Sequence, residues 1–262
     1  MTEKEEKKRI RLTVAYDGTR YAGWQIQPNG LTVQEVLDDC ISDLLGSRIR
    51  TLGASRTDAG VHALGNVAVF DTCARMPADK YAYALNTRLP GDIRIQRSEE
   101  VSPDFHPRFC ETVKTYEYRI LNRRFPDPTR RLNSFHWYGS LDLEAMRRGA
   151  VLLAGTHDFK GFAAANPQTR STVRTIYETD LWKEDDMIHF RITGNGFLYN
   201  MVRIITGTLL EIGKGAMEAE KVSEILSTGD RAKAGPTARA HGLTLVEIRY
   251  PGEEKQKMDV IV

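Results

Sequence analysis

Hydrophobic and polar positions along the chain follow two different periods, which predict strands and helices in mixed order. Alternation with a period of two predicts a half-buried strand over Arg9–Tyr16. Apolar residues at the spacing of one helix face predict an amphipathic helix over Val33–Leu45, behind the capping box Thr32-Val-Gln-Glu35. Gly46 stands where a helix stop belongs.

The same two periods continue to the end of the chain. Further strands are predicted over 48–53, 66–71, 93–101, 112–121, 175–183, 187–193 and 243–248. Further helices are predicted over 77–89, 142–153, 197–212 and 219–226. Strands and helices interleave, and an acidic turn at 184–186 joins two strands as a hairpin, so the pattern predicts an α+β fold. Two prolines within 102–108 predict a boundary there, which divides the chain into domains 1–105 and 106–262.

Composition excludes several classes of protein. With 41% hydrophobic and 27% charged residues among 262, the chain is not disordered. Its three cysteines are far apart, which argues against a disulfide scaffold or a structural zinc site. No segment has the pattern of a secretory signal or a membrane span, so a cytoplasmic location is expected. The formal charge of +2 is near zero, so any affinity for nucleic acid must come from local clusters of charge.

The most unusual segment is the loop from Gly53 to His62, which holds Arg56 and Asp58 among small residues. Loops on a rigid scaffold often carry catalytic groups, and the glycines permit tight backbone turns. The alternative is that Asp58 only caps a turn and that His62 is a hydrogen-bonded structural histidine.

A second candidate is Arg203, which lies among apolar residues within a predicted helix. Its guanidinium cannot lose its charge, so it needs an anionic partner or must extend along its stem to water. If the partner is Asp58, the pairing lowers the pKa of that carboxyl and keeps it ionised, as a nucleophile requires.

A third candidate is a strand face with Lys114, Tyr116 and Tyr118 in line. Such an aromatic face beside a cation can stack a base that has left an RNA helix. The alternative is that both tyrosines belong to the core with their hydroxyls hydrogen bonded.

Two loops have the composition of nucleic-acid contacts. Between Arg119 and Arg131 five arginines face a single acidic residue, Asp127, which would favour a phosphate backbone. The loop from Tyr16 to Gln25 carries Arg20 and Trp24, although Trp24 could equally be a packed core residue. The alternative for the basic loop is a solvated surface with no partner.

Taken together, these segments resemble the tRNA pseudouridine synthase A family. The resemblance is carried, in order, by Tyr16-Asp-Gly-Thr with Gly23-Trp-Gln25, Arg56-Thr-Asp-Ala-Gly-Val-His-Ala63, Lys114-Thr-Tyr116, Phe197-Leu-Tyr-Asn-Met-Val-Arg203 and Ala240-His-Gly-Leu243. Each piece is short, but five pieces in order over nearly the whole chain make a specific match.

The resemblance implies an isomerase without cofactor or metal that converts uridine to pseudouridine at nucleotides 38, 39 and 40 of the tRNA anticodon stem-loop. It implies two α/β halves whose antiparallel sheets meet at a basic cleft, and a homodimer. By the same match, Asp58 is the catalytic aspartate, Arg203 its paired arginine, Tyr116 the stacking tyrosine, and Arg56 the arginine that helps displace the base. The chain departs from the family near its end, with Arg239 where proline is frequent and Thr244 where tyrosine is frequent.

Two other functions use the same features. An RNA-binding protein without catalysis would need the basic loops but would give Asp58 no task. A glycosidase or nucleosidase would need two carboxylates in defined roles, and no second acidic residue with a clear acid role stands in these motifs.

Overall fold

The structure, a computed structural model, describes residues 7–164 and 170–252 and forms two compact units. Unit 1 comprises Met1–Thr112 together with Leu245–Val262, and unit 2 comprises Val113–Thr244. The last strand, β10 (Leu243–Arg249), therefore begins in unit 2 and continues into unit 1. No helix in the described ranges is long and apolar enough to span a membrane.

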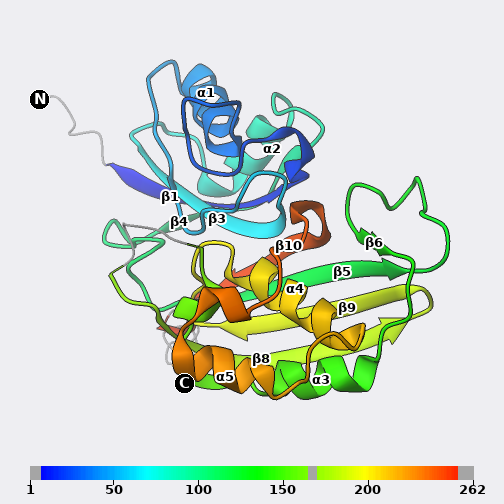
Figure 1. Ribbon diagram of the computed structural model, residues 1–262. Coiled ribbons are helices and arrows are strands. Elements are labelled where there is room, and N and C mark those ends of the chain that lie inside the picture. The colour runs from blue at the N-terminus through cyan, green and yellow to red at the C-terminus, as the bar shows by residue number, and fades with distance from the viewer. Residues whose placement is uncertain (1–6, 165–169, 253–262) are drawn as a thin grey trace, which may run out of the picture. The chain divides into compact units, whose positions relative to one another are not determined.

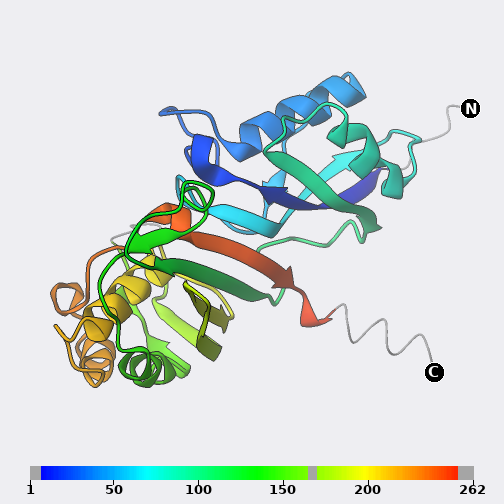
Figure 2. The same ribbon diagram turned by 90° about the vertical axis from the view of Figure 1, so that its right-hand side faces the viewer.

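Unit 1 combines an antiparallel sheet with two helices on one of its faces (Figures 1 and 2). Its strands lie in the order β4-β1-β3-β10, and β2 pairs with β3. The strands are β1 (Lys8–Tyr16), β2 (Leu52–Gly53), β3 (His62–Thr72) and β4 (Ile93–Val101), and the helices are α1 (Val33–Leu45) and α2 (Tyr81–Asn86). Short 3-10 turns at Gly18–Arg20 and Ala78–Lys80 precede the two helices.

Both faces of the unit 1 sheet are covered. On one face Phe70 packs edge to face against Tyr81 at 5.4 Å. On the other, the segment that follows β4 places Phe105 against Val67 and Val69, together with Tyr250. The sheet is therefore a rigid base for the loops that leave its strands.

Unit 2 repeats this layered design with strand order β5-β9-β8-β7. The strands are β5 (Val113–Asn122), β6 (Phe135–Trp137), β7 (Gly155–Asp158), β8 (Val173–Glu184) and β9 (Met187–Gly194). The pairs among β5, β9, β8 and β7 are antiparallel, and β6 runs parallel to β5. Three helices lie on one side of the strands: α3 (Leu143–Val151), α4 (Met201–Gly213) and α5 (Lys221–Thr228). Three 3-10 turns complete the unit: Lys160–Phe162, Arg231–Lys233 and Ala240–Gly242.

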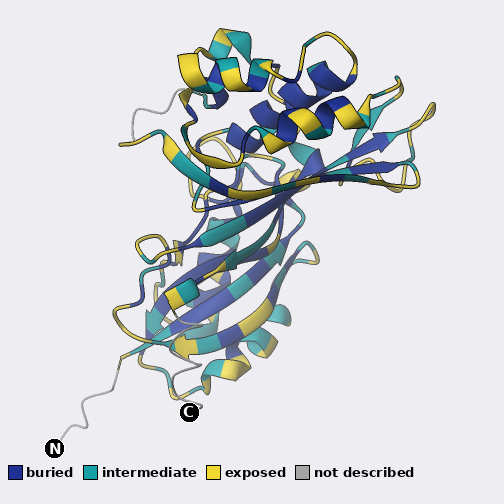
Figure 3. Ribbon diagram, turned by 90° about the horizontal axis from the view of Figure 1, so that it is seen from below, coloured by how far each residue is buried: buried dark blue, intermediate teal, exposed yellow. Residues whose placement is uncertain are grey.

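Burial follows the predicted periods (Figure 3). Exposed positions gather on loops and on the outer sides of helices, whereas the strands carry many buried residues. Helix α4 is an exception, because nearly all of its residues are buried. Such an all-round apolar helix belongs inside a protein rather than on its surface.

The α+β fold is confirmed, and so are the helix over Val33–Leu45 and the strand over Ile93–Val101. The helix predicted over 197–212 begins instead at Met201, because Asn200 adopts a left-handed backbone that a helix cannot continue. The helix predicted over 77–89 contains a 3-10 turn and then ends at Asn86. Strands β6 and β7 were not predicted, since runs of three and four residues are too short to show a period.

Candidate active-site segments

The loop that carries Asp58 lies in unit 1 between β2 and β3 and is fixed by buried polar groups. The Asn66 side-chain amide donates to the Ser55 carbonyl at 3.1 Å and to the Tyr16 hydroxyl at 3.2 Å. The same tyrosine hydroxyl lies 2.8 Å from Oγ1 of Thr57. Asn66 is fully buried, so this network is shielded from water. The residue just before Asp58 is thereby held in one place.

Asp58 itself opens a tight turn. Its carbonyl accepts a hydrogen bond from the amide of Val61 at 3.1 Å. Gly60, at the third position, has φ 77°, a left-handed conformation that glycine adopts without strain. Asp58 is half-buried and Arg56 is exposed. The turn thus sets the direction of Asp58 through its backbone.

The loop that follows β1 packs directly on this turn, which brings two of the quoted motifs together. A Cβ added at Gly18 would lie 2.0 Å from the Val61 carbonyl oxygen, and one at Gly23 would lie 2.6 Å from that of Thr57. The amide of Trp24 donates to the same Thr57 carbonyl at 3.1 Å. Because the two backbones touch, only glycine fits at these contacts.

Trp24 and His62 of these loops are buried and make contacts within the protein. Trp24 is fully buried, and a Cβ at Gly53 would lie 2.1 Å from its indole nitrogen. The ring of His62 is buried, and its Nδ1 accepts from the amide of Gly18 at 3.1 Å. The interpretation of Trp24 as a core residue and of His62 as a structural histidine is confirmed.

Arg108 joins this region from a distant part of unit 1 and was not singled out in the sequence. Its Nε donates to the carbonyl of Gly53 at 2.6 Å. Burial, and then the charge of nearby Arg56, lower the pKa of Arg108. Two like charges therefore stand near each other beside the Asp58 turn, an arrangement that attracts anions.

In unit 2 the two tyrosines of β5 differ in their surroundings. Tyr118 is fully buried and donates its hydroxyl to the carbonyl of Arg239 at 2.8 Å, so it is a core aromatic. Burial raises the pKa of Tyr118. Tyr116 is 7% exposed, and its ring meets that of Phe197 edge to face at 5.0 Å. Phe197 opens the segment that leads to Arg203.

Arg203 lies in the first turn of α4 and is half-buried. Its Nε donates to the carbonyl of Ala238 at 2.8 Å, and its Nη1 donates to Oδ1 of Asn200 at 2.7 Å. The carbonyl of Arg203 in turn accepts from the amide of Ala238 at 3.0 Å. Two neutral oxygens thus orient a charged group. Asn200 lies inside the quoted motif Phe197–Arg203 but was given no role there, and Ala238 was not singled out by the sequence.

The four predicted site residues are divided between the units. Asp58 and Arg56 belong to unit 1, and Tyr116 and Arg203 belong to unit 2. Within each unit the structure links the predicted residue to other quoted motif residues: the Asp58 turn to the loop after β1, and Tyr116 to Phe197.

The basic segment of unit 2 is smaller than the sequence suggested. Arg119 is part of β5 and donates to the buried carboxylate of Glu117 at 2.9 Å, so it does not belong to the loop. The remaining arginines lie between β5 and β6, in a loop that extends away from the strands in Figure 1. We call residues 123–131 the basic loop.

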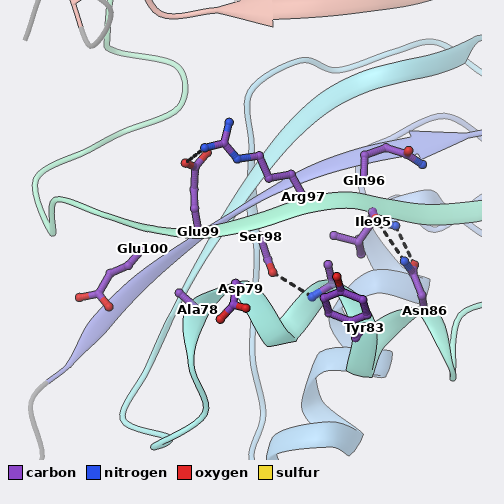
Figure 4. Close-up of a pocket in the computed structure, with 11 residues that line it drawn as sticks. Ala78, Asp79, Tyr83, Asn86, Ile95, Gln96, Arg97, Ser98, Glu99 and Glu100 are labelled. Carbon is purple, nitrogen blue, oxygen red and sulfur yellow. Dashed lines mark hydrogen bonds and ion pairs between the residues drawn. The ribbon is translucent and has the colours of Figure 1, made fainter. Parts of the chain in front are cut away.

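A cavity of about 720 Å³ lies in unit 1 between α2 and the outer strand β4 (Figure 4). Within it the Asn86 side chain bonds both backbone groups of Ile95, and Ser98 accepts from the amide of Ala82 at 2.9 Å. The contacts of Asn86 occupy the backbone groups of Ile95 that an edge strand would otherwise expose. None of the predicted site residues lines this cavity. Over the described ranges, no group of three or more potential ligands could hold a metal ion.

Comparison with known proteins assigns the class. A family model described as tRNA pseudouridine synthase matches residues 12–110 and 150–251. These ranges contain the Asp58 turn, the loop after β1 and Arg203, whereas Tyr116 and the basic loop lie between them. The fold and its loops are thus those of a pseudouridine synthase, which is an isomerase.

Relatives narrow the assignment. A tRNA pseudouridine synthase A from Acetivibrio thermocellus is 46% identical over 92% of this chain and 99% of its own length. The one from Ruminiclostridium cellulolyticum is 48% identical over 93% of this chain and 100% of its own length. The one from Halalkalibacterium halodurans is 50% identical over 90% of this chain and 90% of its own length. The chain belongs to the tRNA pseudouridine synthase A family. The predicted family and enzyme class are confirmed.

Proposed function

We propose that the chain converts uridine to pseudouridine at nucleotides 38, 39 and 40 of the tRNA anticodon stem-loop, with Asp58 as nucleophile. The observation that carries the proposal is the Asp58 turn, whose backbone is fixed by Thr57 and Val61 inside the range that matches the family. A reaction on one glycosidic bond needs a carboxylate held in one direction. A turn held on both sides supplies that direction.

In this proposal the other three residues serve the carboxylate and the base. Arg203 pairs with Asp58 and keeps it ionised, since an adjacent cation favours the charged form of a carboxyl group. Tyr116 stacks on the extruded uracil, which can contribute about 1–3 kcal/mol per base. Arg56 fills the place of the base, because extrusion costs a few kcal/mol that other contacts must offset.

The reaction balances without an external reagent. The bond between N1 of uracil and C1′ of the ribose breaks, the base rotates, and a bond from C5 to C1′ forms. C5 then loses its proton while N1 gains one, so the product is an isomer of the substrate. Asp58 can attack the sugar, attack the base or remove a proton from the sugar, and all three need its ionised form.

The wider properties that we propose come from the family resemblance. They are a basic cleft between two α/β halves, a homodimer, a cytoplasmic location and a reaction without cofactor. The near-neutral charge of +2 supports a local rather than a global attraction for RNA.

Tritium release from tRNA labelled at C5 of uridine tests the proposal. We expect release by the wild type and none by Asp58→Ala or Asp58→Asn, while both variants still bind tRNA. Release that persists in both variants would contradict the role of Asp58 as nucleophile. Tight binding of tRNA by the wild type without any modified base would instead favour a non-catalytic RNA-binding protein, and free uracil among the products would favour a nucleosidase.

A further inference from the structure

Asn200 stands immediately before α4, where an asparagine side chain ordinarily caps the first turn of a helix. Here it makes no such bond. Its Oδ1 instead accepts from Nη1 of Arg203 at 2.7 Å, while its carbonyl accepts the first helical bond from the amide of Ile204 at 2.9 Å. The side chain has therefore exchanged a bond that stabilises the helix for one that holds the arginine.

The backbone at Asn200 is also unusual. It has φ 59° and ψ 7°, in the left-handed region that residues with a side chain seldom adopt. In the described part of the chain one other non-glycine residue has a positive φ, Asp185 at 51°, in the turn between β8 and β9. Forgoing a cap costs about 1 kcal/mol. Local rules broken in this way often mark functional sites.

Arg203 also makes two hydrogen bonds with the backbone of Ala238. Nε of the guanidinium donates to Ala238, whose own amide donates back to the Arg203 carbonyl. The segment before Ala238 packs closely against α4 at Gly207, where a Cβ would lie 1.7 Å from the Pro236 carbonyl oxygen. A guanidinium is planar, so contacts at Nε and Nη1 fix the direction of its remaining edge.

We propose that Asn200 is a positioning residue, which acts through Arg203 by fixing the direction of its guanidinium. This inference rests on the proposed function, in which Arg203 serves Asp58. It assigns Asn200 no contact with the substrate. Its loss should therefore slow the chemical step and leave tRNA binding unchanged.

The test is Asn200→Gly, which keeps the left-handed backbone and removes the amide. A hydrogen bond to a charged group corresponds to about a tenfold effect or more, so we expect kcat for pseudouridine formation to fall about tenfold. KM for tRNA and the melting temperature should stay near the wild-type values. The matched control is Asp185→Gly, the same kind of backbone position outside the proposed site, which should change neither constant.

A second variant, Asn200→Asp, and a double-mutant cycle with Arg203→Lys distinguish a positioning role of Asn200 from a role in folding. Asn200→Asp keeps the size of the side chain but sets a carboxylate 2.7 Å from Nη1, where it competes for Arg203, so kcat should fall again. This variant decides the question if Asn200→Gly melts far below the wild type. In an Arg203→Lys background, Asn200→Gly should cost less than twofold, because the interaction is already lost.

Unchanged kcat in both Asn200 variants would overturn the inference, and so would a full tenfold loss added on top of Arg203→Lys. A wild-type protein that forms no pseudouridine would overturn the proposed function itself. The two failures are therefore distinct, since the positioning role is overturned alone only when the wild type is active.

Discussion

Glu117 is a buried carboxylate of unit 2 that is held by three cationic or imidazole side chains, although it has no part in the proposed reaction. Its side chain is 4% exposed and accepts from Arg191 at 2.6 Å, from Arg119 at 2.9 Å and from His189 at 3.2 Å. Burial raises the pKa of Glu117, but these hydrogen bonds outweigh it and lower the pKa to about 2. Trp182 stacks on His189 at 4.7 Å and lies beneath Arg191, which ties β8 to the same cluster.

The pKa of Glu117 predicts how stability depends on pH. Because it is lower in the folded state than its ordinary value of 4.5, the stabilisation is complete above pH 4.5 and is lost as pH falls towards 2. The difference corresponds to about 3 kcal/mol at pH 7. We expect Glu117→Gln to lower the free energy of unfolding in urea by about 2–3 kcal/mol at pH 7 and by roughly half that at pH 3.

Glu178→Gln, at an exposed position on β8, which is separated from β5 by β9, is the control for this measurement and should have little effect at either pH. A gap between wild type and Glu117→Gln that stayed constant from pH 7 to pH 3 would show that the charge of Glu117 does not provide the stabilisation.

Arg239 stands where the family often has proline, and this difference from the family leaves the path of the backbone unchanged. Its φ is −61°, close to the angle that a proline ring imposes, so arginine follows the same path. Its carbonyl accepts from the hydroxyl of Tyr118. The turn that follows, Ala240–Gly242, is closed against that tyrosine, because a Cβ at Gly242 would lie 2.5 Å from its ring. Thr244 is buried in the strand beyond.

At the scale of elements, the sequence predicted the helix ends that are specified by nearby capping residues. The hydroxyl of Thr32 accepts from the amide of Glu35 at 3.3 Å, and Gly46 ends the helix with φ 63°, as the capping box and glycine indicated. Asp142 caps α3 in the same way. Each of these signals lies within a few residues of the structure it specifies, so the sequence displays it directly.

Elements that depend on distant contacts were not predictable in this way. The apolar run from Phe197 predicted a helix, but Phe197 turns its ring to Tyr116 of another strand instead. The same holds near the candidate residues of each unit, because Ala238 contacts Arg203 from 35 residues away in unit 2, and Arg108 contacts Gly53 from 55 residues away in unit 1. Periodicity carries no information about such pairs, whereas the quoted motifs marked Asp58 and Arg203 as residues to examine.

The contact between the loop after β1 and the Asp58 turn predicts the effect of one methyl group. Gly18→Ala must displace the backbone of Val61, because the new Cβ would lie 2.0 Å from its carbonyl oxygen. We expect a loss of about 1–3 kcal/mol in the free energy of unfolding and a fall in kcat of at least tenfold.

Gly91→Ala is the matched control, since a Cβ there meets nothing within 4 Å. This substitution should leave kcat unchanged and alter stability by about 1 kcal/mol or less. If Gly18→Ala were as active as Gly91→Ala, the direction of Asp58 would not depend on the packing of the two loops.

At the scale of the whole molecule, charge is nearly balanced and its distribution matters more than its sum. The chain has 37 basic and 35 acidic side chains, and many of them form ion pairs across strands or along helices. In the basic loop the pairs are long, 3.5 Å from Arg123 to Asp186 and 3.8 Å from Arg130 to Asp127. Exposed pairs of this kind contribute little, so the loop keeps a positive field.

The basic loop also presents an aromatic surface. The guanidinium of Arg124 lies 5.1 Å from the ring of Phe125, which is 64% exposed, and Arg131 donates to the carbonyl of Pro128 at 2.7 Å. An exposed ring beside arginines is suited to RNA, which offers both phosphates and unstacked bases. The loop lies outside the ranges that match the family model.

Removing the positive charges of Arg124 and Arg131 tests whether the basic loop binds RNA. If Arg124 and Arg131 contact phosphates, the double variant Arg124→Ala with Arg131→Ala should weaken tRNA binding and flatten its dependence on salt. Each lost phosphate contact reduces the slope of log K against log salt concentration by about 0.7–0.9, because fewer counterions are released. A double variant of equal charge change on unit 1, Lys80→Ala with Arg88→Ala, separates local contact from net charge. An equal loss of slope in both variants would mean that the loop acts only through the overall field, and an unchanged slope in the first would mean that it is a solvated surface.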